Sequence, residues 1–233
     1  SLPILQGATS DTEANLRVLV PTGLNYDYTV IDGTGRRRAL LPYEKKGVAV
    51  SGQMIEAFFL TGLTHDSTYT FEVAEGSRVL DRRLFKTYSS AVFESRVPLR
   101  VALISCMNDR YESDQAEMWN GVAVSEPELM IFNGDCCYVD QRADGTIEGM
   151  WSRHVTTRQM LDVFRWDRLV PTLASWDDHD TGENDANSTN PKLGPAGEYF
   201  MAMFGSEPTR GMAHSSGRSY RADFGGVRFL MLD

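Results

Sequence analysis

The first part of the chain is built from short segments in which apolar and polar residues alternate. These segments lie between Leu16 and Phe85, and clusters of Gly, Asp, Asn and Pro separate them at intervals of roughly 8 to 12 residues. Short alternating strands with turn residues at this spacing are typical of a β-sandwich. The expected strands cover residues 16–20, 26–31, 48–50, 54–60, 69–73 and 79–85.

The segment from Leu60 to Phe71 has the sequence Leu-Thr-Gly-Leu-Thr-His-Asp-Ser-Thr-Tyr-Thr-Phe. It resembles the tyrosine-corner stretch of fibronectin type III domains. The resemblance implies that the hydroxyl of Tyr69 bonds to backbone across the corner while Leu63 packs inside. We find no cluster of catalytic residue types in this half of the chain, and His65 is expected to be a solvated loop residue.

The pattern changes after a polar stretch at residues 87–90, which predicts a linker. Apolar runs at residues 99–105, 128–132 and 170–176 predict strands. Helical spacing predicts helices over residues 114–122, with Ser113 or Asp114 as N-cap, and over residues 149–166. Strands that alternate with helices imply a sheet with parallel members. We therefore expect a β-sandwich domain over residues 1–90 and an α/β domain, with helices flanking its sheet, over residues 91–233.

Composition and charge narrow the function classes. The 233 residues include 42% hydrophobic and 24% charged residues, as expected of a folded protein. The net charge of −9 argues against binding to nucleic-acid backbone. An acidic protein that handles an anionic substrate needs local positive charge, which metal ions held by carboxylates supply. We see no apolar run long enough for a transmembrane segment and no signal peptide in this chain.

Groups that bind metal ions follow each strand of the second half. Cys106 follows the first strand, Gly-Asp-Cys-Cys-Tyr at residues 134–138 follows the second, and Asp-Asp-His-Asp at residues 177–180 follows the third. Ligands gather beyond the C-terminal ends of parallel strands. Taken singly, Cys106 also fits a small buried apolar residue, and Asp135 fits a turn or a helix N-cap. Three acids around one histidine are costly without a cation, so the signals together predict a metal site.

Two of these motifs resemble those of PhoD-like (alkaline phosphatase D type) metallophosphatases, within the calcineurin-like metallophosphoesterase superfamily. Residues 132–138 match the Gly-Asp-x-x-Tyr form, and residues 175–180 resemble a Trp-Asp-Asp-His-Asp segment. The Ser-Cys pair ending at Cys106, and the strand-like runs at residues 219–220 and 227–233, also fit. The resemblance covers essentially the whole chain. It implies a metallophosphoesterase-like sheet behind a fibronectin-like or immunoglobulin-like sandwich.

The resemblance also implies site roles and an activity, the hydrolysis of phosphate esters by metal-activated water. Cys106, Asp135 and Tyr138 would ligate one metal, Fe³⁺, because thiolate and phenolate suit that charge. Asp135 would also reach a second ion, shared with Asp178, for which oxygen ligands suit Ca²⁺, Mg²⁺, Mn²⁺ or Zn²⁺. His179 would be catalytic, stabilising the transferred phosphoryl group or protonating the leaving oxygen.

Further residues have less specific expectations. Asp177 and Asp180 would fix the loop or orient His179. The family's remaining histidine ligands come from motifs that His214 does not match. We therefore expect further ligands from a segment of the same protein beyond Asp233. Three arginines are candidates for phosphate contacts, although a solvated surface position is the commoner role: Arg110, Arg153 and Arg158.

Other functions compete with this interpretation. The same metal core serves phosphodiesterases that act on lipid or nucleotide diesters. A degenerate phosphatase that acts as a binding or adhesion module is an alternative from another class, although Asp135, Asp178 and His179 are all present. A thiol redox protein that uses Cys136 and Cys137 is a third, although the Cys-x-x-Cys spacing is absent. By the family resemblance the protein would be periplasmic or secreted.

Overall fold

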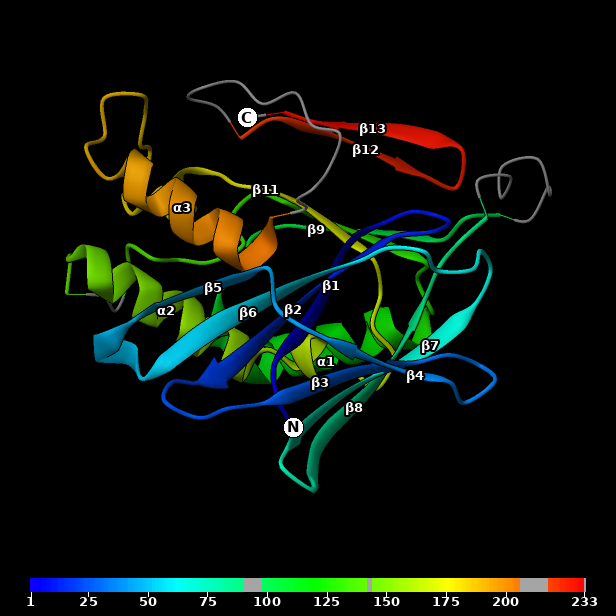
Figure 1. Ribbon diagram of the computed structural model, residues 1–233. Coiled ribbons are helices and arrows are strands. Elements are labelled where there is room, and N and C mark those ends of the chain that lie inside the picture. The colour runs from blue at the N-terminus through cyan, green and yellow to red at the C-terminus, as the bar shows by residue number, and fades with distance from the viewer. Residues whose placement is uncertain (90–97, 142–143, 206–217, 233) are drawn as a thin grey trace.

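The computed structural model describes residues 1–89, 98–141, 144–205 and 218–232. Two four-stranded antiparallel sheets form its first half, with strand orders β1-β2-β6-β5 and β4-β3-β7-β8 (Figure 1). Their facing residues share one apolar core, which includes Leu16, Phe58 and Phe71. The strands are β1 (Ile4–Thr9), β2 (Ala14–Pro21), β3 (Asp27–Ile31), β4 (Arg37–Leu40), β5 (Glu44–Val48), β6 (Gln53–Leu60), β7 (Thr68–Glu75) and β8 (Arg78–Lys86).

Most of the strands expected in this half are present, with shifted ends. The strand expected at residues 48–50 is wrong, because β5 ends at Val48 and a 3₁₀ turn occupies Ala49–Ser51. Strands β1 and β4 were not expected from the sequence. The bond expected at the tyrosine corner is present, since the backbone N–H of Thr64 donates to the hydroxyl of Tyr69 at 2.7 Å. Leu63 beside it is buried.

A three-stranded parallel sheet lies at the centre of the second half. Its order is β11-β10-β9, and both pairs are parallel, as the alternation of strands and helices predicted. Helix α1 (Glu112–Val124) connects the first two strands and α2 (Ile147–Met160) precedes the third. The strands are β9 (Val101–Ile104), β10 (Leu129–Asn133) and β11 (Thr172–Ser175).

The two expected helices differ from the structure at their ends. Helix α1 begins at Glu112 and has Tyr111, without a side-chain capping bond, in the N-cap position, so the expected cap was wrong. Helix α2 ends at Met160, because Leu161 is extended, and a separate 3₁₀ turn covers Asp162–Arg165. Helix α3 (Leu193–Phe204) was not expected.

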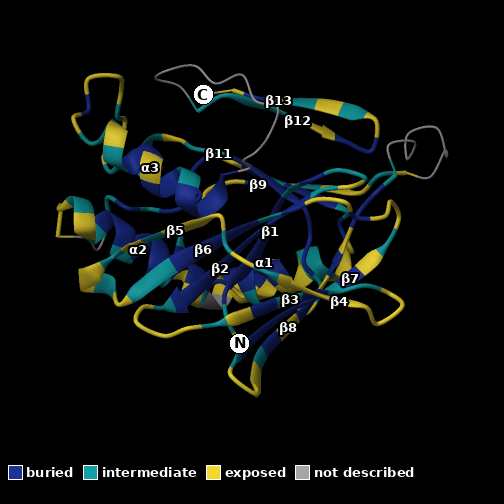
Figure 2. Cartoon of the chain, in the orientation of Figure 1, coloured by how far each residue is buried: buried dark blue, intermediate teal, exposed yellow. Residues whose placement is uncertain are grey.

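Alternate residues of β10 face two different layers. Met130 and Phe132 belong to a core with helical residues such as Phe204, whereas Leu129 packs with the hairpin of β12 (Tyr220–Phe224) and β13 (Val227–Met231). The helical core also takes in Leu5 and other residues of the first half. Buried residues therefore run through all the layers (Figure 2). Among the residues described, no helix is long and apolar enough to cross a membrane.

Candidate metal centre

The three parallel strands end side by side and bring their following loops together. The register pairs Phe132 of β10 with Ile104 of β9, and Asn133 with Ser175 of β11. Backbone bonds then join the loops, because the N–H of Gly134 donates to the carbonyl of Ser175 at 3.1 Å. Groups placed just after each strand therefore share one edge of the sheet.

The backbone at this edge adopts conformations that are costly for most residues. Cys106 and Asp135 have φ angles of 56° and 50°, in the left-handed region. This region costs an L-residue about 1 to 2 kcal/mol, and such strain is concentrated at functional sites. Gly134 has a φ of 82°, and a Cβ there would meet the Cβ of Asp177 at 2.9 Å. Only glycine lets these two loops approach so closely.

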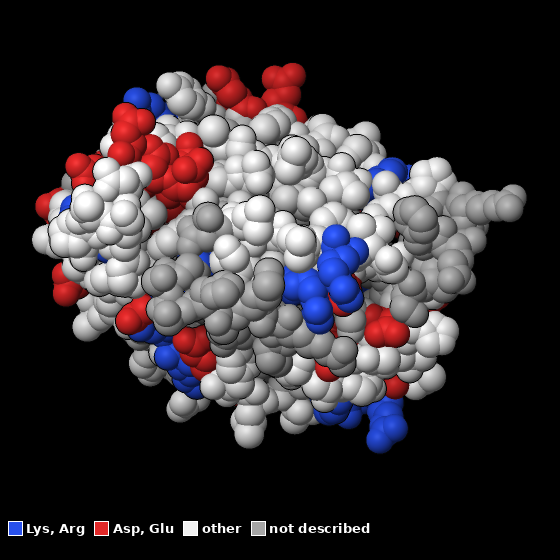
Figure 3. Space-filling view, turned by 90° about the horizontal axis from the view of Figure 1, so that it is seen from above, with Lys and Arg blue, Asp and Glu red and all other residues white. Residues whose placement is uncertain are grey.

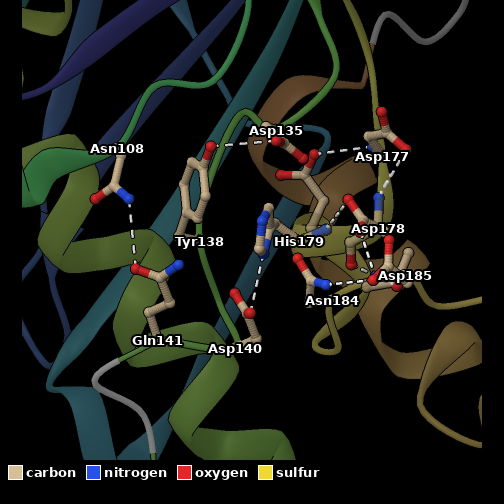
Figure 4. A network of polar contacts seen from close by, with 12 residues as sticks. Asn108, Asp135, Tyr138, Asp140, Gln141, Asp177, Asp178, His179, Asn184 and Asp185 are labelled. Atoms are coloured by element: carbon tan, nitrogen blue, oxygen red, sulfur yellow. Dashed lines mark hydrogen bonds and ion pairs between the residues drawn. The ribbon is translucent and has the colours of Figure 1, made fainter.

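The structure brings the expected site residues together (Figure 4). Ligand atoms of Asp135, Asp178 and His179 all lie within 4.8 Å of one another. The thiol of Cys106 lies 3.5 Å from Oδ2 of Asp135, and the hydroxyl of Tyr138 donates to the same oxygen at 3.2 Å. The cluster thus combines thiol, phenol, imidazole and carboxylate groups, all of which are side chains of the kinds that ligate metal ions in proteins.

The electrostatics of the cluster also fit a cation. Burial raises the pKa of Asp135, against the opposing effect of His179 and of its hydrogen bonds. Burial raises the pKa of Tyr138 as well, helped by its bond with Cys106 and the charge of Asp135. Oδ1 of Asp135 is buried without a hydrogen-bond partner in the described structure. A buried carboxylate oxygen needs a partner, and a cation would supply it.

Asp178 has a different environment in the same cluster. Partial burial disfavours its charge, but N–H groups of Asp185 and His179 bond to its carboxylate and lower its pKa overall. It therefore holds a negative charge at neutral pH and faces the more deeply buried Asp135. A cation beside both carboxylates would favour the ionised form of each, including the buried Asp135.

The imidazole of His179 is held from two sides. Its Nδ1 lies 2.9 Å from Oδ2 of Asp140, and its ring lies against Tyr138, with 4.2 Å between centroids. Sequence analysis missed Asp140 and expected Asp177 or Asp180 to orient the ring. The available signal was a carboxylate two residues after Tyr138, in the loop that already carries Asp135.

Asp180 fastens the two loops to each other. Its side chain is fully buried and accepts backbone N–H groups from Cys136 at 3.0 Å, Cys137 at 2.7 Å and Asp177 at 3.1 Å. Burial raises its pKa to about 8, and the three N–H bonds act in the opposite direction. Asp177 is exposed and accepts the N–H of Asp178 at 2.9 Å, at the start of the 3₁₀ turn Asp178–Thr181.

The arginines considered for phosphate contacts are placed differently. Arg153 is buried, and its guanidinium donates to both oxygens of Asp109 at 2.8 Å. Arg158 is also buried, 4.6 Å from the ring centres of Phe164 and of another phenylalanine. A solvated position is therefore wrong for both of them. Arg110 is exposed and donates to the side-chain oxygen of Gln141 at 2.9 Å, while His214 lies outside the described residues.

Acidic side chains gather at the end of the molecule that carries the site, on the left in Figure 3. Exposed acids of the loop that follows β11 include Asp177, Glu183 and Asp185. Without a bound cation, this surface repels anions.

Comparisons with known proteins show the fold. No family model and no curated protein sequence matches the chain. The solved structure of PhoD aligns with this chain at a TM-score of 0.69 and 16% sequence identity. The alignment covers 99% of this chain and 51% of the PhoD chain. The chain thus spans about half the length of that protein. At this identity the likeness shows a similar mixed α/β fold and not a shared function.

Other solved structures align more weakly. The sensor domain of the anti-sigma factor RsgI4 from Pseudobacteroides cellulosolvens covers 38% of this chain and 91% of its own, at 18% identity and a TM-score of 0.30. Amylomaltase from Corynebacterium glutamicum covers 56% of this chain and 21% of its own, at 11% identity and a TM-score of 0.29. TM-scores this low establish no common fold.

Proposed function

We propose that the chain carries site residues of a metal-dependent phosphoesterase, which hydrolyses phosphate esters with metal-activated water. One observation carries the proposal: Asp135, Asp178 and His179 converge within 4.8 Å at the C-terminal edge of a parallel sheet. The PhoD-like fold and the motif resemblance at residues 132–138 and 175–180 support it.

In this proposal the donors are divided between two ions. Cys106, Asp135 and Tyr138 would hold one ion, for which Fe³⁺ is the proposed species. Asp135 and Asp178 would hold the other, with Ca²⁺, Mg²⁺, Mn²⁺ or Zn²⁺ as candidates. Bound ions would neutralise the phosphate and lower the pKa of a coordinated water. The unpartnered Oδ1 of Asp135 supports its role as the residue common to both ions.

His179 would donate a proton to the leaving group, and Asp140 would hold its imidazole ring in place. The contact at 2.9 Å between Nδ1 of His179 and Oδ2 of Asp140 favours a proton on Nδ1 and fixes the ring. When the ring is protonated, the same carboxylate stabilises the imidazolium, and Nε2–H is then the group that donates to a leaving oxygen. The ring of Tyr138 limits rotation of the imidazole from the other side.

The test combines metal analysis with an assay. Metal content and the hydrolysis of p-nitrophenyl phosphate are measured for the protein, for Asp178→Ala and for His179→Ala. We expect Asp178→Ala to lose metal and activity, and His179→Ala to keep metal and lose activity by a factor of about 10² or more. Glu183→Ala, an exposed acid of the same loop, is the matched control and keeps both. Full hydrolysis by folded Asp178→Ala would defeat the proposal.

Two alternatives are separated by related measurements. Rates on bis-p-nitrophenyl phosphate and on the monoester distinguish a diesterase from a monoesterase. Retention of metal without hydrolysis of either ester would favour a binding module. A thiol redox role is disfavoured, because burial raises the pKa of the Cys136 thiol and raises that of Cys137 to about 12, so neither forms a reactive thiolate.

A further inference from the structure

A cavity lies at the opposite edge of the parallel sheet from the candidate metal centre. Its volume is about 400 Å³. Its apolar walls are Ala123 near the end of α1, Pro127 just before β10, and Val170 just before β11. Because β10 and β11 run parallel, Asp135 and Asp178 lie beyond their other ends, and the five residues of β10 alone separate the two edges by about 16 Å at roughly 3.3 Å per residue. The cavity is therefore separate from the metal centre.

The remaining wall of this cavity presents hydrogen-bond donors. It is formed by Arg165, Trp166, Asp167 and Arg168, so that one carboxylate also belongs to it. Arg168 donates one N–H to the carbonyl of Pro127 at 3.1 Å. In the described part of the chain, the side-chain donors of Arg165 and the indole N–H of Trp166 have no acceptor within hydrogen-bonding distance. Several donors thus meet in one hollow with few acceptors to satisfy them.

The acid in the lining, Asp167, forms no ion pair with either of these arginines. The side chain of Asp167 is fully exposed, at 106%, and its nearest cationic partner is Arg83, at 4.0 Å. The lining has two guanidinium groups and one carboxylate, which is a local excess of positive charge in a chain with a net charge of −9. This excess favours an anion over a neutral ligand.

The shape of the wall adds a second requirement. The indole of Trp166 is held edge-on against Trp119, with 6.1 Å between ring centroids, so it is a fixed surface. A fixed indole beside apolar walls suits a ligand with a flat ring, because aromatic rings pack on one another. The Trp166 side chain is already held in place, so it loses little conformational entropy when a ligand binds. Guanidinium groups bind carboxylate, phosphate or sulfonate groups through paired N–H donors.

We propose that this cavity binds a small organic anion that joins a planar ring to a carboxylate, phosphate or sulfonate group. The ring lies against Trp166 and the walls, and the anionic group accepts from Arg165 and Arg168. This proposal does not depend on the phosphoesterase activity, because its groups and its location are separate from those of the metal centre.

The test follows the indole N–H signals of the four tryptophans by ¹⁵N–¹H NMR during titration. The probe is naphthalene-2-sulfonate, and 2-naphthalenemethanol is its uncharged analogue. We expect the Trp166 signal, assigned with Trp166→Phe, to move saturably with the sulfonate. The uncharged analogue should bind about tenfold more weakly or worse, which corresponds to the loss of a charged hydrogen bond.

Variants separate specific binding from general attraction. Arg165→Gln removes a guanidinium that makes no side-chain bond in the described structure, so the fold should persist, and affinity should fall about tenfold. Arg36→Gln, on an exposed turn of the β-sandwich, removes the same charge elsewhere and should leave affinity unchanged. No saturable shift of the Trp166 signal, equal affinity for the uncharged analogue, or undiminished binding by Arg165→Gln would each overturn the proposal.

Discussion

Asp180 holds together the two loops that carry the candidate site, and its removal should be costly. Its carboxylate is fully buried and accepts backbone N–H groups from Cys136 at 3.0 Å, Cys137 at 2.7 Å and Asp177 at 3.1 Å. The first two donors belong to the loop after β10, and the third to the loop after β11. Asp180→Ala removes the shared acceptor and leaves three backbone donors without partners.

The size of the effect follows from these donors. A buried donor without a partner costs about 1 to 3 kcal/mol, so three of them set a range of about 3 to 9 kcal/mol. The variant also removes a carboxyl group whose raised pKa, about 8, shows that burial of its charge is itself unfavourable. This relief offsets part of the loss, and we therefore expect the low end, about 3 kcal/mol. Domains of ordinary stability have about 5 to 15 kcal/mol in total.

Asp177→Ala is the matched control for this experiment. Asp177 is exposed and its side chain accepts the N–H of Asp178 at 2.9 Å, as an N-cap does. Loss of a cap costs about 1 kcal/mol. Urea unfolding at pH 7 should therefore place Asp180→Ala about 2 kcal/mol below Asp177→Ala. Equal free energies of unfolding for the two variants would refute the reasoning that Asp180 fastens the loops.

Three further predictions concern stability, each measured by urea unfolding. Burial lowers the pKa of His154 to about 3. Below pH 6.5 the imidazole therefore binds a proton in the unfolded chain but stays neutral in the folded state. Stability should fall by about 2 kcal/mol between pH 7 and pH 5 on this account, and His154→Leu should remove that part of the fall; an unchanged pH dependence would contradict it. Gly134→Ala, with a φ of 82° and a Cβ 2.9 Å from the neighbouring loop, should cost at least about 1 kcal/mol more than Gly76→Ala, where φ is 57° and the space is open. Arg153→Met leaves Asp109 buried and unpaired and should cost about 3 to 5 kcal/mol, whereas a loss below 1 kcal/mol would show that the pair is dispensable.

The place of the candidate site was predictable because it depends on chain order alone. Strands that alternate with helices form a parallel sheet, and the residues after each strand then meet at one edge. Cys106, Asp135 and Asp178 were found in this way. Asp140 was missed because its role depends on His179, which lies 39 residues further along the chain. A contact between side chains of different loops leaves no periodic signal in a sequence.

Strand β4 was missed and β5 was misplaced for a different physical reason. Strands β4 and β5 lie at the edges of their sheets, where charged residues such as Arg37, Lys45 and Lys46 replace the apolar alternation. Charges at an edge prevent pairing with another chain, and they also remove the pattern by which a strand is recognised. Strand β2 is buried on both faces, since Leu16 belongs to the sandwich core and Leu19 to the helical core.

The buried arginines show how the first half of the chain is joined to the second. Arg17 of β2 donates to the carbonyl of Ala202 at 3.0 Å, and Arg158 of α2 donates to the carbonyl of Met203. Both acceptors lie in the last turn of α3, where helix carbonyls lack partners within the helix and carry partial negative charge. The two arginines therefore satisfy carbonyls of one helix end, and they connect three elements that are far apart in the chain. Their burial is explained by the acceptors that α3 offers, which become visible only when the fold is known.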